Sequence, residues 1–327
     1  MSLLENIRLR ASKNPKTIVL PESDDQRTLD ALRVILDRKI ARVILVGKDE
    51  LAKKVGSKNS GDLQIVDPAG YKDIETLSSA YYELRKLKGV TPEQAREAVL
   101  NDNLIFGAML VRLDRADGFV AGANHTTADT VRAALKCMRI DKEIGVVAGS
   151  FLMEVPNSKF GENGVFVMAD CAVNPEPNAR QLAGIAVLSA RLFSQLVGAV
   201  PRVAFLSYSS KGSASGPLVE KVKEALSRAK EISPGLIIDG ELQVDSAIVP
   251  EVAMIKCPES EVAGKANVLI FPDLNSGNIS YKMTQRLANA RAVGPQLVGF
   301  TKPCSDLSRG CNVEDIIDAA AITAIRS

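Results

Sequence analysis

Residues 17–46, TIVLPESDDQRTLDALRVILDRKIARVILV, decide the fold of this chain. The stretch holds two short runs rich in β-branched residues, 17–20 and 42–46, and each run predicts a buried strand. Between them Leu29, Leu32 and Leu36 recur at helical spacing, which predicts a helix over residues 27–38. A strand, a helix and a second strand in this order are typical of a unit with parallel strands.

The same alternation continues along the rest of the chain. Further strands are predicted at residues 63–66, 118–121, 145–148, 165–168, 203–206, 236–239 and 268–271. Helical patterns separate many of these strands, so we expect an α/β fold with mostly parallel sheets. The 327 residues are enough for about two domains, with a boundary near residue 147.

Composition and charge are ordinary for a soluble globular enzyme. Hydrophobic residues make up 46% and charged residues 24% of the chain, and 41 basic residues against 39 acidic ones leave a net charge of +2. This balance argues against binding of the whole protein to nucleic acid or to a membrane surface. No apolar run approaches the roughly 20 residues of a membrane span, and the first residues lack the apolar core of a signal peptide.

Cysteine and histidine usage suggests a cytoplasmic protein without a transition-metal site. The five cysteines are scattered, and no pair has the C-x-x-C spacing of a zinc or redox site. Such cysteines are expected to be reduced thiols, as in the cytosol. His125 is the single histidine, which excludes a His-rich metal site, and we expect it to form structural hydrogen bonds.

Several polar segments follow predicted strands, where open α/β sheets bind ligands near helix N-termini. These segments are residues 21–27, 121–132, 207–217, 271–278 and 308–315. In the third, small residues would let the backbone approach an anion, and Lys211 would add positive potential. The Walker and dinucleotide-binding glycine motifs are both absent, and a simple turn is the alternative interpretation.

The last of these segments carries the clearest chemistry. Arg309 offers a planar fork suited to phosphate oxygens, Ser308 can donate a hydrogen bond, and Asp315 could accept a proton. A structural interpretation is also open, because Asn312 suits the N-cap of a helix that Asp315 would support three residues later. The two interpretations do not exclude each other.

Taken together, the segments resemble the phosphate acetyltransferase (phosphotransacetylase) family. The matching stretches are 21–27, 83–86 with 88–89, 116–132, 170–175, 206–217, 239–243, 263–278 and 302–315. They occur in the family's order and cover essentially the whole chain. The chain departs from the common family pattern at Ser23, Ala133 and Cys304, none of which is a charged site residue.

The resemblance implies a fold similar to isocitrate and isopropylmalate dehydrogenases, with two α/β domains and an active site in the cleft between them. The first domain would be discontinuous, residues 1–147 plus 290–327, and the second, residues 148–289, would be inserted into it. Because the family is typically homodimeric, a homodimer is expected.

The resemblance also implies reversible acetyl transfer between acetyl phosphate and coenzyme A. The coenzyme A thiolate would attack directly in a ternary complex, without a metal or a tightly bound cofactor. Carried over by motif, Asp315 is the proton acceptor, Ser308 the hydroxyl donor and Arg309 the phosphate-binding arginine. The residues expected to bind phosphate or coenzyme A are Arg27, Arg85, Arg132, Ser209, Lys211 and Asn275. On sequence alone each of the first three arginines could instead be an ordinary solvated surface residue.

Three alternatives remain at this point. A phosphate butyryltransferase would use the same chemistry on a longer acyl chain, which changes pocket binding by only about 1–3 kcal/mol per methylene. A metal-dependent decarboxylating dehydrogenase of related fold would need clustered aspartates and a nucleotide-binding loop, and neither is evident. A noncatalytic regulatory domain would not need Ser308, Arg309 and Asp315 together.

Overall fold

The computed structural model describes residues 2–48, 50–51, 55 and 61–327. The chain forms two compact units, Met1–Ile140 with Phe300–Ser327, and Asp141–Gly299. The boundaries expected from the sequence place residues 141–147 and 290–299 in the first domain, whereas in the structure they belong to the second unit. Strand β10 (Arg291–Val298) explains the second difference, because its backbone pairs with β5 (Ala148–Glu154) in the sheet of the second unit.

The first unit is a parallel sheet with helices on both faces. Its elements are α1 (Leu3–Lys13), β1 (Thr17–Leu20), α2 (Gln26–Asp37), β2 (Arg42–Val46), β3 (Leu63–Val66), η1 (Pro68–Gly70), α4 (Ile74–Arg85), η2 (Lys86–Lys88), α5 (Pro92–Asn101), α6 (Asn103–Arg112), β4 (Gly118–Ala121), α7 (Thr127–Cys137), β11 (Cys304–Asp306) and α13 (Val313–Arg326). The strand order is β3-β2-β1-β4-β11, and every pair in it is parallel.

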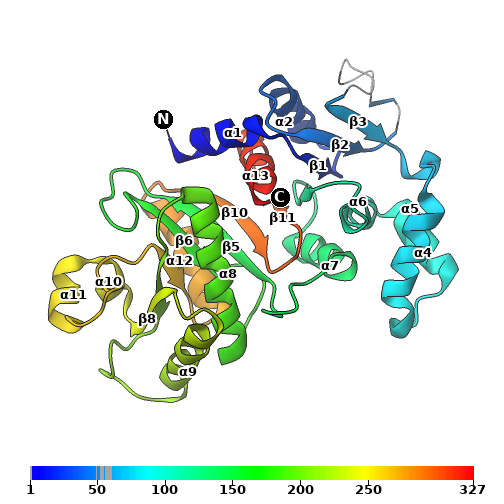
Figure 1. The fold of residues 1–327 in the computed structure, drawn as a ribbon. Coiled ribbons are helices and arrows are strands. Elements are labelled where there is room, and N and C mark those ends of the chain that lie inside the picture. The colour runs from blue at the N-terminus through cyan, green and yellow to red at the C-terminus, as the bar shows by residue number, and fades with distance from the viewer. Residues whose placement is uncertain (1, 49, 52–54, 56–60) are drawn as a thin grey trace. The chain divides into compact units, whose positions relative to one another are not determined.

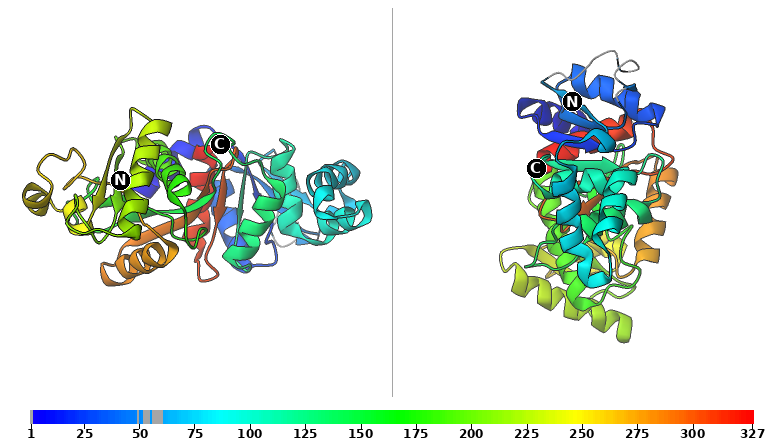
Figure 2. Two further views of the ribbon diagram at one scale, coloured as in Figure 1. Left: turned by 90° about the horizontal axis from the view of Figure 1, so that it is seen from below. Right: turned by 90° about the vertical axis from the view of Figure 1, so that its right-hand side faces the viewer.

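Neighbouring residues of the central strands show which helices cover which face. Val19 and Phe119 pack against Gly107 of α6, whereas Ile18 and Gly118 face the side of α13. Successive strand residues point to opposite faces, so α6 and α13 lie on opposite sides of the sheet. Helix α13 also packs against α1, and α4 packs against α5, as both figures show (Figures 1 and 2). Because both faces are covered, β4 is buried along its whole length.

The second unit has a mixed sheet. Its elements are β5, β6 (Val165–Ala169), α8 (Ala179–Val197), β7 (Arg202–Leu206), α9 (Pro217–Ile232), β8 (Ile237–Leu242), α10 (Val244–Ile248), α11 (Pro250–Lys256), β9 (Val268–Ile270), α12 (Leu274–Leu287) and β10. The strand order is β10-β5-β6-β9-β7-β8, in which the first two pairs are antiparallel and the others parallel.

Aliphatic side chains and a few rings form the core of the second unit. The buried face of α8 packs against β6, β7 and β9, while α12 packs against β5, β6 and β10. On α12, the ring of Tyr281 stacks on Phe151 of β5 at a centroid distance of 3.9 Å. The aliphatic core follows from a composition with no tryptophan and only 4% aromatic residues.

The sequence patterns located most of the strands. The predicted strands 17–20, 42–46, 63–66 and 118–121 coincide with β1 to β4, and the α/β class with mostly parallel strands is confirmed. The strand expected at 145–148 is wrong, because Gly145 has a positive φ of 69° and β5 begins only at Ala148. Strands β10 and β11 were missed. No helix in the described part of the chain is long and apolar enough to cross a membrane.

Candidate active site

Three loops of the first unit meet where the neighbouring strands β1, β4 and β11 end. They are residues 21–25, 122–126 and 307–312, and each leads into a helix. Asp25, Thr126 and Asn312 cap these helices, each accepting a hydrogen bond from a backbone N–H of the first turn. Three adjacent helix N-termini create positive potential at this edge of the sheet, which favours anions.

Glu22 holds the loop after β4 in place. It is only 2% exposed, and its carboxylate accepts hydrogen bonds from the backbone N–H groups of Gly122, Ala123, Asn124 and His125 at 2.8–3.2 Å. The His125 ring nitrogen Nδ1 lies 2.7 Å from Glu22 Oε1, in agreement with a structural role for the histidine. The sequence assigned Glu22 no role of its own, although its place in the polar segment 21–27 after β1 was a signal.

Arg27 connects all three loops. Its guanidinium donates to both carboxylate oxygens of Asp25, to the carbonyl of Ala123 in the second loop, and to the carbonyls of Arg309 and Cys311 in the third. These bonds use the five N–H donors of a guanidinium. The hydrogen bonds with Asp25 raise the pKa of Arg27, and those from Arg27 lower the pKa of Asp25.

Ser308 and Arg309 lie exposed on the third loop. The Ser308 hydroxyl oxygen accepts a hydrogen bond of 3.2 Å from the N–H of Gly310. Arg27 fixes the backbone of Arg309 through the carbonyl, while the guanidinium of Arg309 has no partner among the described residues. The loop therefore presents a free hydroxyl hydrogen and a free planar fork beside the N-terminus of α13.

Asp315 lies in the first turn of α13 and takes part in a capping box. Its backbone N–H donates to Asn312 Oδ1 at 3.0 Å, and its Oδ2 accepts from the N–H of Asn312 at 2.9 Å. The capping interpretation of Asp315 is thus confirmed. The side chain is partly exposed, and its other carboxylate oxygen has no hydrogen-bond partner among the described residues.

Arg132 lines a cavity of about 480 Å³ next to these loops. The other lining residues are Pro21, Asp24, Asn101, Asp102, Asn103, Leu104, Ile105, His125, Asp129, Ala133 and Lys136. Arg132 is exposed and pairs with Asp129 at 2.7 Å within α7. A cavity of this size is typical of a small-molecule site.

The family model described as phosphate acetyl/butaryl transferase matches residues 2–324. The chain belongs to this family. A phosphate acetyltransferase of Thermoanaerobacterium thermosaccharolyticum is 49% identical over 328 residues, which cover 100% of both chains. One of Acetivibrio thermocellus is 50% identical over 328 residues, which cover 100% of this chain and 98% of the relative.

Solved structures agree with this family. A phosphotransacetylase from Streptococcus pyogenes superposes with a TM-score of 0.92 at 42% identity, covering 99% of this chain and 98% of that one. A structure from Salmonella typhimurium assigned as a 4-hydroxythreonine-4-phosphate dehydrogenase superposes with a TM-score of 0.54 at 8% identity, covering 96% and 99%. The second likeness concerns the fold alone and supports the expected dehydrogenase-like α/β architecture.

Arg85, the last residue of α4, lies apart from this cavity's lining. Its side chain is partly buried, and its Nε has no hydrogen-bond partner among the described residues. The charge of Arg85 acts on Tyr81 and Cys137, whose pKa values are raised chiefly by burial and are lowered slightly by the arginine. Helix α4, which ends at Arg85, packs against α7, which carries Cys137.

The remaining predicted binding residues lie in the second unit, where protein groups already occupy two of them. The buried Ser209 hydroxyl donates to Glu241 at 2.9 Å and accepts from the N–H of Ala214 at 3.0 Å. Lys211 pairs with Asp239 at 2.5 Å. The bond between Ser209 and Ala214 fits the alternative interpretation of residues 207–217 as a turn, and the other two bonds tie this segment to β8. Asn275 is exposed near the start of α12.

Asp306, at the end of β11, is a buried carboxyl group beside the site that the sequence did not reveal. It is fully buried, and its carboxylate oxygens have no hydrogen-bond partner of good geometry among the described residues. A Cβ atom added at Gly122 would lie 2.5 Å from Asp306 Oδ1. Asp306 therefore lies directly behind the loop after β4. Burial raises its pKa to about 7, although the hydroxyls of Thr127 and Thr130 oppose the shift.

The cysteines offer no activated nucleophile near these loops. All five are free and buried. Burial raises the pKa of Cys311 to about 11 and that of Cys171 well above its ordinary value, so both are protonated thiols at neutral pH. Within the described part of the chain, no group of three or more His, Cys, Asp and Glu side chains could hold a metal ion.

Proposed function

We propose that the chain is a phosphate acetyltransferase, which transfers an acetyl group reversibly between acetyl phosphate and coenzyme A. The observation that carries the proposal is the loop before α13. At a helix N-terminus it exposes the Ser308 hydroxyl and the Arg309 guanidinium, which has no partner among the described residues, with the Asp315 carboxylate one turn away. Relatives named phosphate acetyltransferase match the chain over its full length.

In the proposed reaction, the coenzyme A thiol attacks the carbonyl carbon of acetyl phosphate. Asp315 accepts the thiol proton as the new carbon–sulfur bond forms, because the thiolate is the reactive form. The carbonyl oxygen becomes an oxyanion, to which the Ser308 hydroxyl donates a hydrogen bond. The tetrahedral intermediate then collapses, and the carbon–oxygen bond breaks with its electron pair going to phosphate.

Arg309 binds the phosphate group in this proposal. Its planar fork can donate two parallel hydrogen bonds, which position the leaving group and offset its charge. Direct reaction between two bound substrates also gains from their fixed orientation. The reaction as written needs no metal, no tightly bound cofactor and no covalent enzyme intermediate.

Arg132 has the better placement for substrate binding among the remaining arginines. It is exposed in the cavity beside the loops, so we propose that it binds a phosphate group of coenzyme A or acetyl phosphate. Arg27 has its five donors engaged within the protein, which supports a positioning role in place of direct binding. Arg85, Ser209, Lys211 and Asn275 stay predicted binding residues.

A panel of acetyl, propionyl and butyryl phosphates tests the proposed substrate. Each is incubated with coenzyme A, and the initial rate of thioester formation is measured by absorbance. Acetyl phosphate should have the highest kcat/KM, with a loss of roughly 10-fold or more for each added methylene if the pocket fits the short chain. A preference for butyryl phosphate would favour the butyryltransferase alternative, and no thioester from any of the three would contradict the acyl-transfer proposal.

We also propose a cytoplasmic homodimer. Five buried, unpaired cysteines fit a reducing compartment. Ile279, Met283 and Leu287 are exposed by 56%, 53% and 80% at successive four-residue steps of α12. They form one apolar stripe, and such stripes on a helix surface mark interaction sites.

A further inference from the structure

A small pocket with three cations lies in the first unit, away from the three active-site loops. Arg112 ends α6, Arg139 follows α7 by two residues, and Lys302 precedes β11. All three therefore lie where the parallel strands β4 and β11 begin, whereas the active-site loops follow where these strands end. A four-residue strand such as β4 separates the two edges of the sheet by about 13 Å.

The positive charges of this pocket exceed its negative charge. Lys302 Nζ pairs with Asp114 Oδ1 at 2.7 Å and also donates to the carbonyl of Ala116. The pKa of Asp114 is lowered mainly by Lys302, with a smaller effect from Arg139. Neither Arg112 nor Arg139 has a carboxylate within ion-pair distance in the part of the chain that the structure describes. Among the described residues, three cations thus share one carboxylate.

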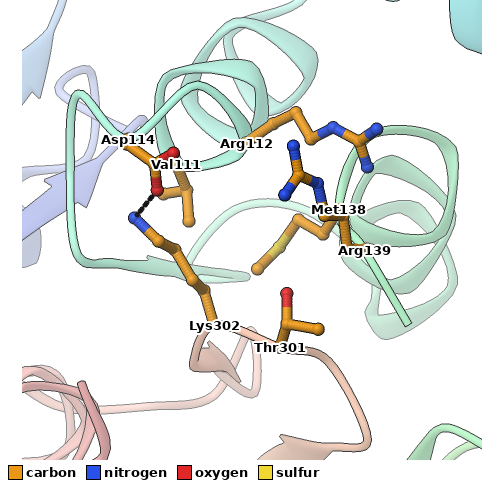
Figure 3. A pocket seen from close by; sticks show the side chains of 7 residues that line it. All are labelled: Val111, Arg112, Asp114, Met138, Arg139, Thr301 and Lys302. Atoms are coloured by element: carbon orange, nitrogen blue, oxygen red, sulfur yellow. Dashed lines mark ion pairs between the residues drawn. The ribbon is translucent and has the colours of Figure 1, made fainter. Parts of the chain in front are cut away.

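The two arginines line the pocket next to each other. Figure 3 shows their guanidinium groups side by side, with the Met138 side chain drawn between them and the Thr301 hydroxyl. Burial lowers the pKa of Arg112, and the charge of Arg139 lowers it further. The backbone N–H of Thr301 donates to the Arg139 carbonyl at 2.9 Å, which fixes these two residues relative to each other.

Helix dipoles account for part of this arrangement. The C-termini of α6 and α7 each favour a nearby cation. However, no hydrogen bond from either guanidinium to a carbonyl is formed within the described residues, so the N–H donors of both forks stay open. A dipole explains why one arginine stands at each helix end, but not why two like charges face the same cavity.

We propose that Arg112 and Arg139 bind a small tetrahedral oxyanion of the phosphate or sulfate type. Each arginine fork can donate two hydrogen bonds to such an anion, and the anion relieves the repulsion between the two guanidinium groups. The cavity volume of about 40 Å³ suits a group of that size and is too small for a nucleotide. The site is separate from the proposed acetyl transfer, and its test does not depend on that activity.

Selenate, a sulfate analogue with an anomalous scatterer, locates the site directly. Crystals of the whole chain are soaked in sodium selenate, and an anomalous peak is expected between Arg112 and Arg139. In solution, the thermal unfolding midpoint is measured with sodium sulfate against sodium chloride at equal ionic strength. The sulfate-specific rise in the midpoint should be smaller in Arg139→Met than in the parent protein.

Arg286→Met is the matched control, because it removes an exposed arginine from the last turn of α12 in the second unit. Its sulfate response should equal that of the parent protein. Arg112→Met provides an independent second variant, and the selenate peak in the parent protein needs no variant at all. Absence of a peak between the arginines overturns the proposal. A peak with equal sulfate responses in Arg139→Met, Arg112→Met and Arg286→Met marks binding at crystal concentration only, and overturns it as well.

Discussion

Replacing Asp315 by asparagine separates its capping role from its proposed catalytic role. In the structure Asp315 forms two capping-box bonds with Asn312, at 2.9 and 3.0 Å. An asparagine amide oxygen can still accept the first of these, and the backbone N–H still donates the second. The loss is then mainly that of a negative charge near a helix N-terminus, about 0.3–1 kcal/mol of stability.

The expected effect of Asp315→Asn on turnover is much larger. An amide cannot accept the thiol proton, so kcat should fall by roughly 100-fold or more, which corresponds to about 3 kcal/mol in the activation barrier. The affinity for coenzyme A should change little, because the lost interaction belongs to the transition state. Steady-state kinetics, coenzyme A titration and thermal unfolding measure these three effects separately.

Glu314→Gln is the control for this experiment. Glu314 lies in the same helical turn, 57% exposed, and pairs with Arg8 at 2.6 Å. Its replacement removes the same charge at a similarly small cost in stability, and kcat should stay near the parent value. Normal turnover in Asp315→Asn would refute the proton-acceptor role. An equal loss in both variants would assign the effect to charge at the helix N-terminus.

Three further predictions concern other parts of the molecule. Arg27→Lys should lower both the unfolding midpoint and kcat with little change in the KM for coenzyme A, because the hydrogen bonds of Arg27 link the three loops. A raised KM at unchanged stability would instead indicate that Arg27 binds substrate directly. Asp306→Asn should raise the unfolding midpoint relative to the parent protein by more at about pH 8 than at about pH 4. In the folded protein the buried carboxyl keeps its proton up to a pKa of about 7, whereas in the unfolded chain it loses the proton near the ordinary pKa of 3.8. The parent protein therefore loses stability as pH rises through this window. A difference in midpoint between variant and parent that does not change with pH would contradict this. Met283→Asp should shift the proposed homodimer toward monomer, as measured by sedimentation at several concentrations, whereas Gln285→Asp on the same helix should not. Equal sedimentation of both variants and the parent protein would exclude the α12 stripe as the interface.

Local patterns were enough to locate much of the secondary structure. The leucine spacing of residues 27–38 predicted α2, and Asn312 with Asp315 predicted the start of α13. Both features depend on residues within one or two helical turns, so a single sequence shows them. Strand β11 was missed because three residues carry too little periodicity, and only pairing with β4 makes them a strand.

The candidate site was predictable in its residue types but not in its contacts. The segment 308–315 indicated phosphate chemistry through Ser308, Arg309 and Asp315. The sequence could not show that Arg27 already donates to the backbone of that segment, 282 residues away at Arg309. It could not show either that the polar groups of Ser209 and Lys211 are occupied by Glu241 and Asp239.

The sequence by itself determined the α/β class, the helix caps and the family to which the chain belongs, because spacing, capping and ordered motifs are properties of short segments. Only the tertiary structure decided which segments meet. The strand order β3-β2-β1-β4-β11 brings loops from both ends of the chain together, buries Asp306 behind Gly122, and places Arg112 beside Arg139. Burial and pairing over such separations result from packing of the whole unit, and no local pattern encodes them.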